Sequence, residues 1–177
     1  MIFNEAPIAG VFTIEPKLLE DDRGFFARMF CQHEFEAHGL EGKFLQCNLS
    51  YNGFKGTVRG MHFQKTPHEE VKLVRCTRGA IFDVIVDYRP DSPTYLQWFG
   101  AELSESNRRM LYVPRGFAHG YQTLSEGAEV FYQVSEFYMP GSEGGLNWRD
   151  PAFGIDWPLK EAKHISDKDA NWPLLNL

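Results

Sequence analysis

Two histidines are the side chains in this sequence most suited to moving a proton near neutral pH. His62 lies in the stretch VRGMHFQ at residues 58–64, where a cation and an imidazole sit beside a glycine in a segment patterned as a strand. His119 follows a proline turn at residues 114–116 and precedes Gly120. Glycine beside an imidazole lets a ligand approach the backbone closely. A single such histidine is most often a core residue, but two in one small β protein favour a shared pocket.

A metal site is the first alternative for two histidines in a β fold. A three-ligand site needs another histidine or a carboxylate close by. The chain has no His-x-His pair, and the neighbours of His62 are glycine, methionine, phenylalanine and glutamine. We therefore expect a site without a metal or any other cofactor, in which His62 transfers protons.

An imidazole in that role needs a carboxylate to orient it and an acid on the opposite side of the substrate. Tyr132 and Tyr138 have the same strand parity and are candidate acids, with packing in the sheet as the alternative. Lys72 is a candidate for stabilising an oxyanion, against the usual surface position of a lysine. Three aspartates are candidates for the orienting carboxylate: Asp83, Asp167 and Asp169.

Short segments with two-residue alternation, separated by glycine and proline turns, account for most of the chain. At least eight such segments with hardly any helix predict an all-β jelly roll. One short helix is expected at residues 32–38, ending at Gly39. Strands are expected at residues 10–14, 25–30, 44–50, 58–64, 70–76, 80–88, 95–102, 109–113, 119–123 and 129–134.

The two-residue period of a strand also predicts which side chains share a face. Gln46, Asn48 and Ser50 face together, which predicts either a wet cavity or a solvent-facing strand. Gly60 could mark a bulge that brings Arg59 to the side of His62.

The segments 70–76 and 80–88 are predicted to form a hairpin through the turn at Arg78-Gly79. In the first arm, Lys72 shares a face with Val74 and Cys76. In the second, Asp83 is a carboxylate in an apolar strand and must find a partner if it is buried.

Length and charge limit the classes of protein that the chain can represent. With 177 residues it fits one domain over residues 1–177, with a loop-rich C-terminal part from about residue 140. A net charge of -6 argues against binding nucleic acid through phosphate neutralisation. The N-terminus does not resemble a signal peptide, no apolar run reaches membrane-spanning length, and the three cysteines form no CxxC pair. We expect a cytoplasmic protein that contacts neither nucleic acid nor membrane.

Several motifs, taken in order along the chain, resemble the dTDP-4-dehydrorhamnose 3,5-epimerase family. The resemblance covers almost the whole chain and implies a metal-free cupin jelly roll. It also implies a homodimer that exchanges N-terminal residues between subunits. The motifs are DRGFF at 22–26, QCN at 46–48, VRGMHFQ at 58–64, KLV at 72–74, residues 79–87, SPT at 92–94, residues 114–120 and SDKD at 166–169.

This resemblance assigns a role to each candidate residue. It implies that His62 is the base, that Asp169 is its carboxylate, that Tyr132 is the acid on the other sugar face, and that Lys72 lies near the substrate carbonyl. Tyr138 matches the residue that stacks on the nucleotide base. Further nucleotide and diphosphate contacts match Arg23, Gln46, Asn48, Arg59, His119, Glu143 and Lys168.

The activity implied is epimerisation of a nucleotide-linked 4-keto-6-deoxy sugar at C3, C5 or both, without a cofactor. The expected reaction is dTDP-4-dehydro-6-deoxyglucose to dTDP-4-dehydrorhamnose. The alternatives are a CDP- or GDP-linked substrate, a metal-dependent cupin, and a sugar-nucleotide binding module without activity. Arg28, and the His-Glu-Glu run at residues 68–70, depart from the family pattern and leave the nucleotide open.

Overall fold

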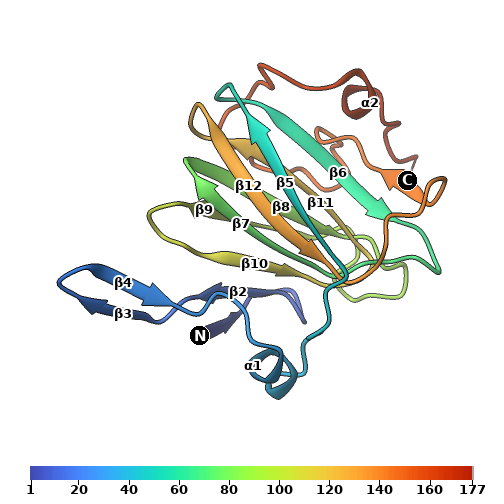
Figure 1. Cartoon of the computed structure of the whole chain (residues 1–177). Helices are drawn as coiled ribbons and strands as arrows, with labels where there is room; N and C mark the ends of the chain where they lie inside the picture. The colour runs from blue at the N-terminus through green and yellow to red at the C-terminus, as the bar shows by residue number, and fades with distance from the viewer. Residues whose placement is uncertain (177) are drawn as a thin grey trace.

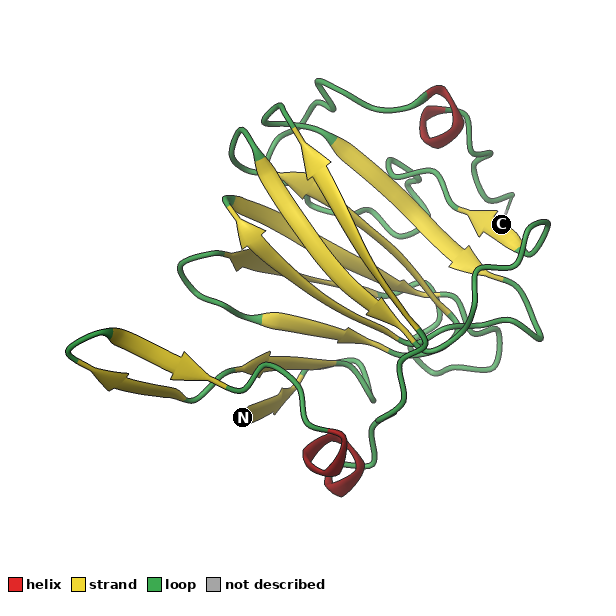
Figure 2. Cartoon of the chain, in the orientation of Figure 1, coloured by secondary structure: helices red, strands yellow, loops and turns green. Residues whose placement is uncertain are grey.

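The fold is a sandwich of two antiparallel β-sheets, from which a separate two-stranded hairpin projects (Figure 1). The structure is a computed structural model that describes residues 1–176. Strands dominate and the two helices are short (Figure 2). The elements are β1 (Ile2–Glu5), β2 (Phe12–Glu15), β3 (Leu18–Asp21), β4 (Gly24–Ala27), α1 (Gln32–Ala37), β5 (Gln46–Asn52), β6 (Val58–Gln64), β7 (Lys72–Arg78), β8 (Ala80–Asp87), β9 (Trp98–Ser104), β10 (Met110–Val113), β11 (Phe117–Thr123), β12 (Ala128–Val134), β13 (Glu143–Gly145) and α2 (Asp167–Ala170).

The larger sheet has the strand order β1-β2-β10-β7-β12-β5, and the other has the order β13-β6-β11-β8-β9. Sheet-on-sheet packing of this kind buries the inner face of each sheet against the other. The predicted all-β jelly roll is confirmed, and so is the helix predicted at residues 32–38, which ends at Ala37.

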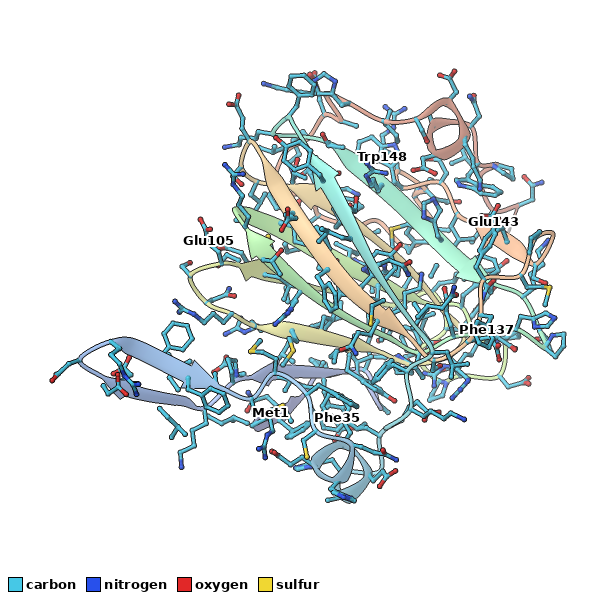
Figure 3. The ribbon with its side chains drawn as sticks, in the orientation of Figure 1. Met1, Phe35, Glu105, Phe137, Glu143 and Trp148 are labelled. Atoms are coloured by element: carbon cyan, nitrogen blue, oxygen red, sulfur yellow. The ribbon has the colours of Figure 1, made fainter. Side chains whose placement is uncertain are left out.

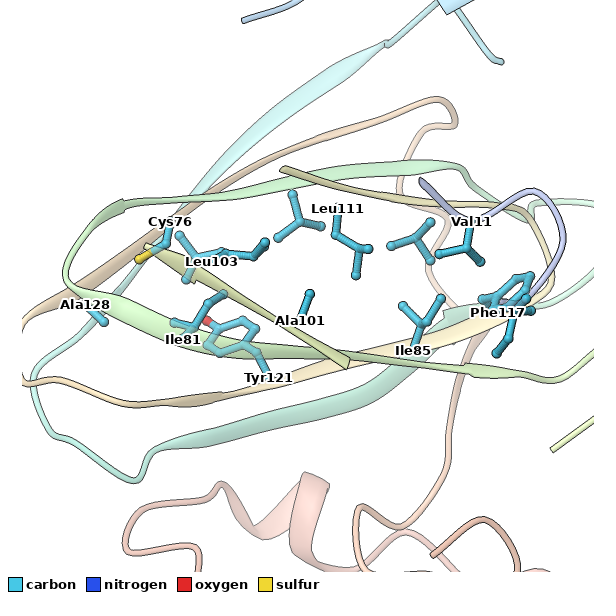
Figure 4. Packing of buried hydrophobic residues seen from close by; sticks show 14 residues of the cluster. Val11, Cys76, Ile81, Ile85, Ala101, Leu103, Leu111, Phe117, Tyr121 and Ala128 are labelled. Atoms are coloured by element: carbon cyan, nitrogen blue, oxygen red, sulfur yellow. The ribbon is translucent and has the colours of Figure 1, made fainter. Parts of the chain in front are cut away.

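The main core lies between the two sheets (Figure 4). Leu111 and Val130 enter it from the larger sheet, and Ile81, Ile85 and Phe117 enter it from the other. All five side chains are at most 4% exposed, so this apolar layer holds the sheets in a defined register.

The C-terminal part covers the outer face of the five-stranded sheet. Trp148, Phe153 and Trp157 pack against Met61 of β6 and Val84 of β8. Burying an aromatic side chain of this size stabilises the fold by roughly 1.5–3 kcal/mol. This packing keeps α2, which follows the aromatic segment, beside β6.

On the outer face of the larger sheet, α1 covers the end formed by β2 and β10. Phe35 is fully buried and points from the helix towards the strands (Figure 3). It packs with Ile14, Leu73 and Met110. Within residues 1–176, neither helix is long and apolar enough to cross a membrane.

The predicted hairpin between residues 70–76 and 80–88 is wrong. β7 pairs with β10 and β12, whereas β8 pairs with β9 and β11, so the turn at Gly79 carries the chain from one sheet to the other. A hairpin and a turn that joins two sheets show the same sequence pattern, which is two alternating segments separated by a glycine turn. The difference is that Cys76 and Ile81 both point into the core between the sheets.

The structure also differs from the predicted strands near the ends of the chain and in the β3–β4 hairpin. Strands β1, β3 and β13 were not predicted, because each is only three or four residues long and shows no clear two-residue alternation. The strand predicted at residues 25–30 is β4, which ends at Ala27.

At Gly60 and Gly120, the paired strands β6 and β11 lie too close together for either residue to carry a side chain. A Cβ on Gly120 would lie 2.6 Å from Met61 Sδ and 2.7 Å from the carbonyl oxygen of Arg59. A Cβ on Gly60 would lie 2.5 Å from Gly120 Cα, and Gly60 also has a φ of 124°. The two glycines therefore allow the strands that carry His62 and His119 to pair closely.

We expect Gly120→Ala to destabilise the fold by about 1–3 kcal/mol, because the added methyl group overlaps backbone atoms of β6. Urea unfolding would measure the loss. Gly53→Ala is the control, since the nearest atom to its Cβ is 4.0 Å away. Equal stability of the two variants would contradict the view that close pairing of β6 and β11 requires glycine at position 120.

Candidate active site

Two adjoining cavities of about 290 and 430 Å³ open between the sheets near β5 and β6. We call them cavity 1 and cavity 2. His62, Lys72 and Tyr132 line both, so these three side chains lie where the cavities meet. Cavity 1 is also lined by Gln46, Asn48, Phe63, Gln64, Glu70, Val134, Tyr138, Glu143, Gly144 and Lys168. Cavity 2 is also lined by Leu49, Ser50, Tyr51, Arg59, His119, Gly120 and Tyr121.

The predicted face of β5 forms one wall of the cavities. Gln46 and Asn48 line cavity 1 and Ser50 lines cavity 2, while the intervening residues Cys47 and Leu49 are exposed. Asn48 pairs with Tyr132 across the β5–β12 ladder, which places both on the inner face. Of the two interpretations of this face, the one that places it in a cavity is confirmed.

His62 is held by a carboxylate from the other end of the chain. Its Nε2 lies 2.6 Å from Asp169 Oδ1, and the backbone N–H of Gly60 donates to Asp169 Oδ2 at 3.2 Å. Asp169 lies in α2, where the hydroxyl of Ser166 caps the helix and accepts from the Asp169 N–H. Of the three candidate aspartates, Asp169 is the one that contacts His62.

The Asp169 carboxylate is ionised and oriented in this environment. Burial by itself would raise its pKa, but hydrogen bonds from His62 and from the Gly60 N–H outweigh burial and hold the pKa below the usual range. An ionised carboxylate on Nε2 leaves the other ring nitrogen, Nδ1, free to act as a base. Asp167, in the same helix, is exposed.

Tyr132 and Lys72 reach the cavities from the larger sheet, opposite the sheet that carries His62. Burial raises the pKa of the Tyr132 phenol, so it is protonated and can donate at neutral pH. Lys72 Nζ lies 3.1 Å from Glu70 Oε1, and both side chains are nearly buried. The lysine faces inward with Val74 and Cys76, as the strand pattern predicts.

Arg59 and His62 share cavity 2 although three residues separate them. The β6–β11 register shifts between His62 and Arg59, so β6 carries one extra residue there. This irregularity at Gly60 confirms the predicted bulge. Arg59 Nε donates to Asn52 Oδ1 at 2.8 Å. Asn52 is the last residue of β5, and this hydrogen bond orients the guanidinium.

His119 faces His62 directly across the β6–β11 ladder. Its Nε2 lies 2.8 Å from Asp83 Oδ1, so Asp83 is the partner of the second histidine and not of the first. The shared pocket predicted from the two glycine-flanked histidines is therefore present.

Tyr138, Glu143 and Lys168 form a polar group at the mouth of cavity 1, where Glu143 is labelled in Figure 3. Lys168 Nζ lies 2.6 Å from Glu143 Oε2. A hydrogen bond with Glu143 raises the pKa of Tyr138, whose backbone N–H also donates to Gln46 Oε1 at 2.8 Å. Tyr138 is 54% exposed, so its ring can stack on a flat ligand.

Arg23 is the one predicted site residue that the structure leaves far from both cavities. It lies at the tip of the β3–β4 hairpin, 89% exposed at its side chain, and pairs with Asp21. Figure 1 shows this hairpin pointing away from β5 and β6. Arg28 is also exposed and lines neither cavity.

Known proteins resemble this chain over nearly its full length. The sequence profile of the dTDP-4-dehydrorhamnose 3,5-epimerase family matches residues 5–176. The chain belongs to this family. A dTDP-4-dehydrorhamnose 3,5-epimerase from Salmonella typhimurium is 46% identical over 177 residues, which cover 99% of this chain and 96% of that protein.

Solved structures of epimerases also match the fold. The dTDP-4-dehydrorhamnose 3,5-epimerase from Bacillus anthracis, with TDP and PPi bound, is 44% identical with a TM-score of 0.94, over 98% of this chain and 99% of that one. The Legionella pneumophila dTDP-6-deoxy-D-glucose-3,5-epimerase, in complex with dTDP-4-keto-L-rhamnose, is 41% identical with a TM-score of 0.93, over 99% and 93%.

The epimerase site contains residues that the sequence analysis did not select. Glu70 holds Lys72, and Gln64 Nε2 donates to Glu70 Oε2 at 3.3 Å. Asn52 orients Arg59. Gln64 shares the strand face of His62, and Glu70 stands two residues before Lys72, so both offered a signal in the sequence. The Asn52–Arg59 contact joins β5 to β6 and offered none. Within residues 1–176, no three His, Cys, Asp or Glu side chains come together in an arrangement that could hold a metal.

The lowered pKa of Asp169 makes the stability of this epimerase depend on pH. The ionised carboxylate stabilises the fold above the ordinary carboxyl pKa, and this contribution is lost as the pH falls through the lowered value. We expect Asp169→Asn to be less stable than the natural protein by roughly 1–3 kcal/mol at pH 7, with a gap that narrows below about pH 4.

Urea unfolding between pH 7 and pH 3 would measure this difference. Asp167→Asn, an exposed change in the same helix, is the control and should alter stability little at any pH. A gap for Asp169→Asn that stays constant down to pH 3 would contradict the ionised pair.

Proposed function

We propose that this chain catalyses epimerisation of dTDP-4-dehydro-6-deoxyglucose to dTDP-4-dehydrorhamnose by proton transfer. His62 acts as the base, Asp169 as its carboxylate, Tyr132 as the acid and Lys72 as the group that stabilises the enolate oxygen. Membership of the epimerase family supports the activity. The position of His62, Lys72 and Tyr132 at the junction of the cavities, with Asp169 against His62, supports the residue roles.

The observation that carries this proposal is that His62 and Tyr132 reach one space from opposite sheets. Inversion at carbon requires that a proton leave one face of the sugar and return to the other. A base on β6 and an acid on β12 meet that requirement with the substrate held between them.

The 4-keto group makes the hydrogens on both neighbouring carbons acidic. An imidazole removes such a carbon-bound proton only if the enolate is stabilised as it forms. The Lys72 ammonium can supply that charge, and Glu70 holds its Nζ in place. Asp169 stabilises the imidazolium that results on His62. In the remaining step the neutral Tyr132 phenol donates a proton to the sugar carbon from the opposite side.

The nucleotide end of the substrate would use the polar rim of the cavities. Tyr138 offers an exposed ring for the base. Arg59 offers a guanidinium that Asn52 holds by Nε, which leaves its terminal nitrogens available for the diphosphate. Five further residues complete this proposed set: Gln46, Asn48, His119, Glu143 and Lys168.

Two substitutions separate the base from the acid. We expect His62→Ala to lower solvent deuterium exchange into the 4-keto sugar nucleotide by at least about 100-fold, because no other group removes the proton. We expect Tyr132→Phe to keep exchange but to block completed inversion. NMR in deuterium oxide measures both, and full exchange in the His62 variant would refute the assigned base.

Matched controls are available for each change. Tyr112→Phe alters a tyrosine on the outer face of the larger sheet, and His33→Ala alters an exposed histidine of α1, so both should keep full activity.

Running the assay with dTDP-, CDP- and GDP-linked 4-keto-6-deoxy sugars tests which nucleotide is accepted. The position of the deuterium label shows whether C3, C5 or both are epimerised.

We also propose that the protein acts as a homodimer in the cytoplasm. The β3–β4 hairpin is a two-stranded sheet with few contacts to the sandwich, and Leu19, Phe25 and Phe26 on it are 58%, 47% and 66% exposed. β5 is an edge strand, and Leu49 and Tyr51 on it are 61% and 60% exposed. Isolated hairpins are marginally stable in water, so apolar packing on a second copy accounts for both surfaces.

In such a dimer the hairpin would carry Arg23 to the site of the other subunit, which accounts for its distance from the cavities of its own chain. The three cysteines are unpaired within the described chain, an arrangement that suits a reducing compartment.

We expect the natural chain to sediment as a dimer and Phe26→Asp to shift it towards monomer, because the charge would be buried in the interface. Sedimentation velocity at micromolar concentration measures this. Phe54→Asp is the control, since Phe54 is similarly exposed but stacks on His164 of its own chain. A natural chain that sediments as a monomer would refute the dimer.

A further inference from the structure

The site contains a second histidine–carboxylate pair beside the first. His119 Nε2 lies 2.8 Å from Asp83 Oδ1, just as His62 Nε2 lies 2.6 Å from Asp169 Oδ1. The two histidines are direct partners across the β6–β11 ladder. The proposed proton transfer uses only the His62 pair, so the pair with Asp83 has no part in it.

Asp83 is an unfavourable residue for stability at its position. It is 0% exposed, and its Oδ2 is buried without a hydrogen-bond partner among residues 1–176. Its neighbours on the same face of β8, Ile81 and Ile85, point into the apolar core between the sheets (Figure 4). An apolar side chain here would avoid the cost of a buried, half-paired carboxylate. The carboxylate is therefore explained better by what it does to His119.

Asp83 fixes the ring of His119, because Asp83 Oδ1 accepts a hydrogen bond from its Nε2. Nδ1 makes no hydrogen bond to the described residues and is left for a ligand. A phosphate oxygen at Nδ1 would be a second acceptor on the same ring, and an imidazole held between two anionic acceptors donates from both nitrogens. His119 is 7% exposed and lines cavity 2.

Cavity 2 is suited to an anion. Its lining includes Arg59 and Lys72 as well as His119, and no carboxylate among the described residues. Cavity 1 is different, because Glu70 and Glu143 both line it. A hydrogen-bond donor added by His119 thus strengthens an already cationic space.

We propose that Asp83 is a positioning residue that holds His119 so that its Nδ1 donates a hydrogen bond to the diphosphate of the nucleotide sugar in cavity 2. This inference rests on the proposed function for the identity of the ligand. Asp83 itself touches no substrate and acts through His119.

Replacing Asp83 with asparagine in the full chain tests the proposal, because the side chain keeps its shape and loses its charge. Calorimetric titration with dTDP, and separately with inorganic pyrophosphate, should show binding about 10- to 100-fold weaker than in the natural protein, the loss of one charge-assisted hydrogen bond. In turnover, KM should rise by a similar factor while kcat changes little.

Asp87→Asn is the matched control for a structural effect. Asp87 lies on the same strand and is also 0% exposed, but it pairs with Arg89 outside both cavities. This change should lower stability and leave the dissociation constants for both probes unaltered. Equal weakening of binding in both variants would overturn the proposal, because the effect would then be a general loss of structure.

A double-mutant cycle with His119→Asn shows whether Asp83 acts through the imidazole. Asp83→Asn should add nothing once His119 is replaced. Long-range ¹H–¹⁵N NMR should also show a proton on His119 Nε2 in the natural protein and a changed signal pattern in Asp83→Asn. Additive losses, or an unchanged His119 signal, would overturn the proposal.

The two probes keep this inference separate from the proposed function. If pyrophosphate binding weakens in Asp83→Asn while the natural protein converts none of the sugar nucleotides, the positioning role stands and the function fails. If the natural protein is active and Asp83→Asn binds both probes normally, the function stands and the positioning role is overturned. Failure of the natural protein to bind either probe also overturns it.

Discussion

The site depends on one hydrogen bond, between His62 on β6 and Asp169 in α2. The two residues are 107 positions apart, and they meet because the C-terminal part is packed along the outer face of the five-stranded sheet. Trp148 and Trp157 bury that face, and the Val58 N–H donates to the carbonyl of His164, which ties the segment to the start of β6. Apolar packing on the outer face of β6 thus holds Asp169 against His62, whose side chain lines the cavities.

The space between the sheets is divided between a core and a cavity. Along β7 and β12, side chains such as Val74 and Val130 fill the core, whereas Lys72 and Tyr132 on the same faces line the cavities. The change from apolar to polar residues within one face makes a hollow that admits ligand without breaking either sheet. Because the sandwich is rigid, the acid and the base are held at fixed positions on opposite walls.

Charge is unevenly distributed over this hollow. Cavity 1 pairs each lysine with a glutamate, Lys72 with Glu70 and Lys168 with Glu143, so its cations are partly neutralised. Cavity 2 shares Lys72 with cavity 1 but adds Arg59 and His119, and no carboxylate among the described residues lines it. A diphosphate is therefore better matched to cavity 2, and a neutral sugar or base to cavity 1.

Local sequence determined the strand periods, the short helix at residues 32–38, and the face of β5 that carries Gln46 and Asn48, because the two-residue and 3.6-residue repeats are properties of neighbouring residues. A glycine close to each of two imidazoles pointed to a shared pocket, and Gly60 pointed to a bulge. The sequence could not choose among the candidate aspartates from spacing, nor see that the turn at Gly79 joins two sheets. Those outcomes depend on pairing between strands and on the C-terminal packing, contacts between residues far apart in the chain, which only the tertiary structure decides.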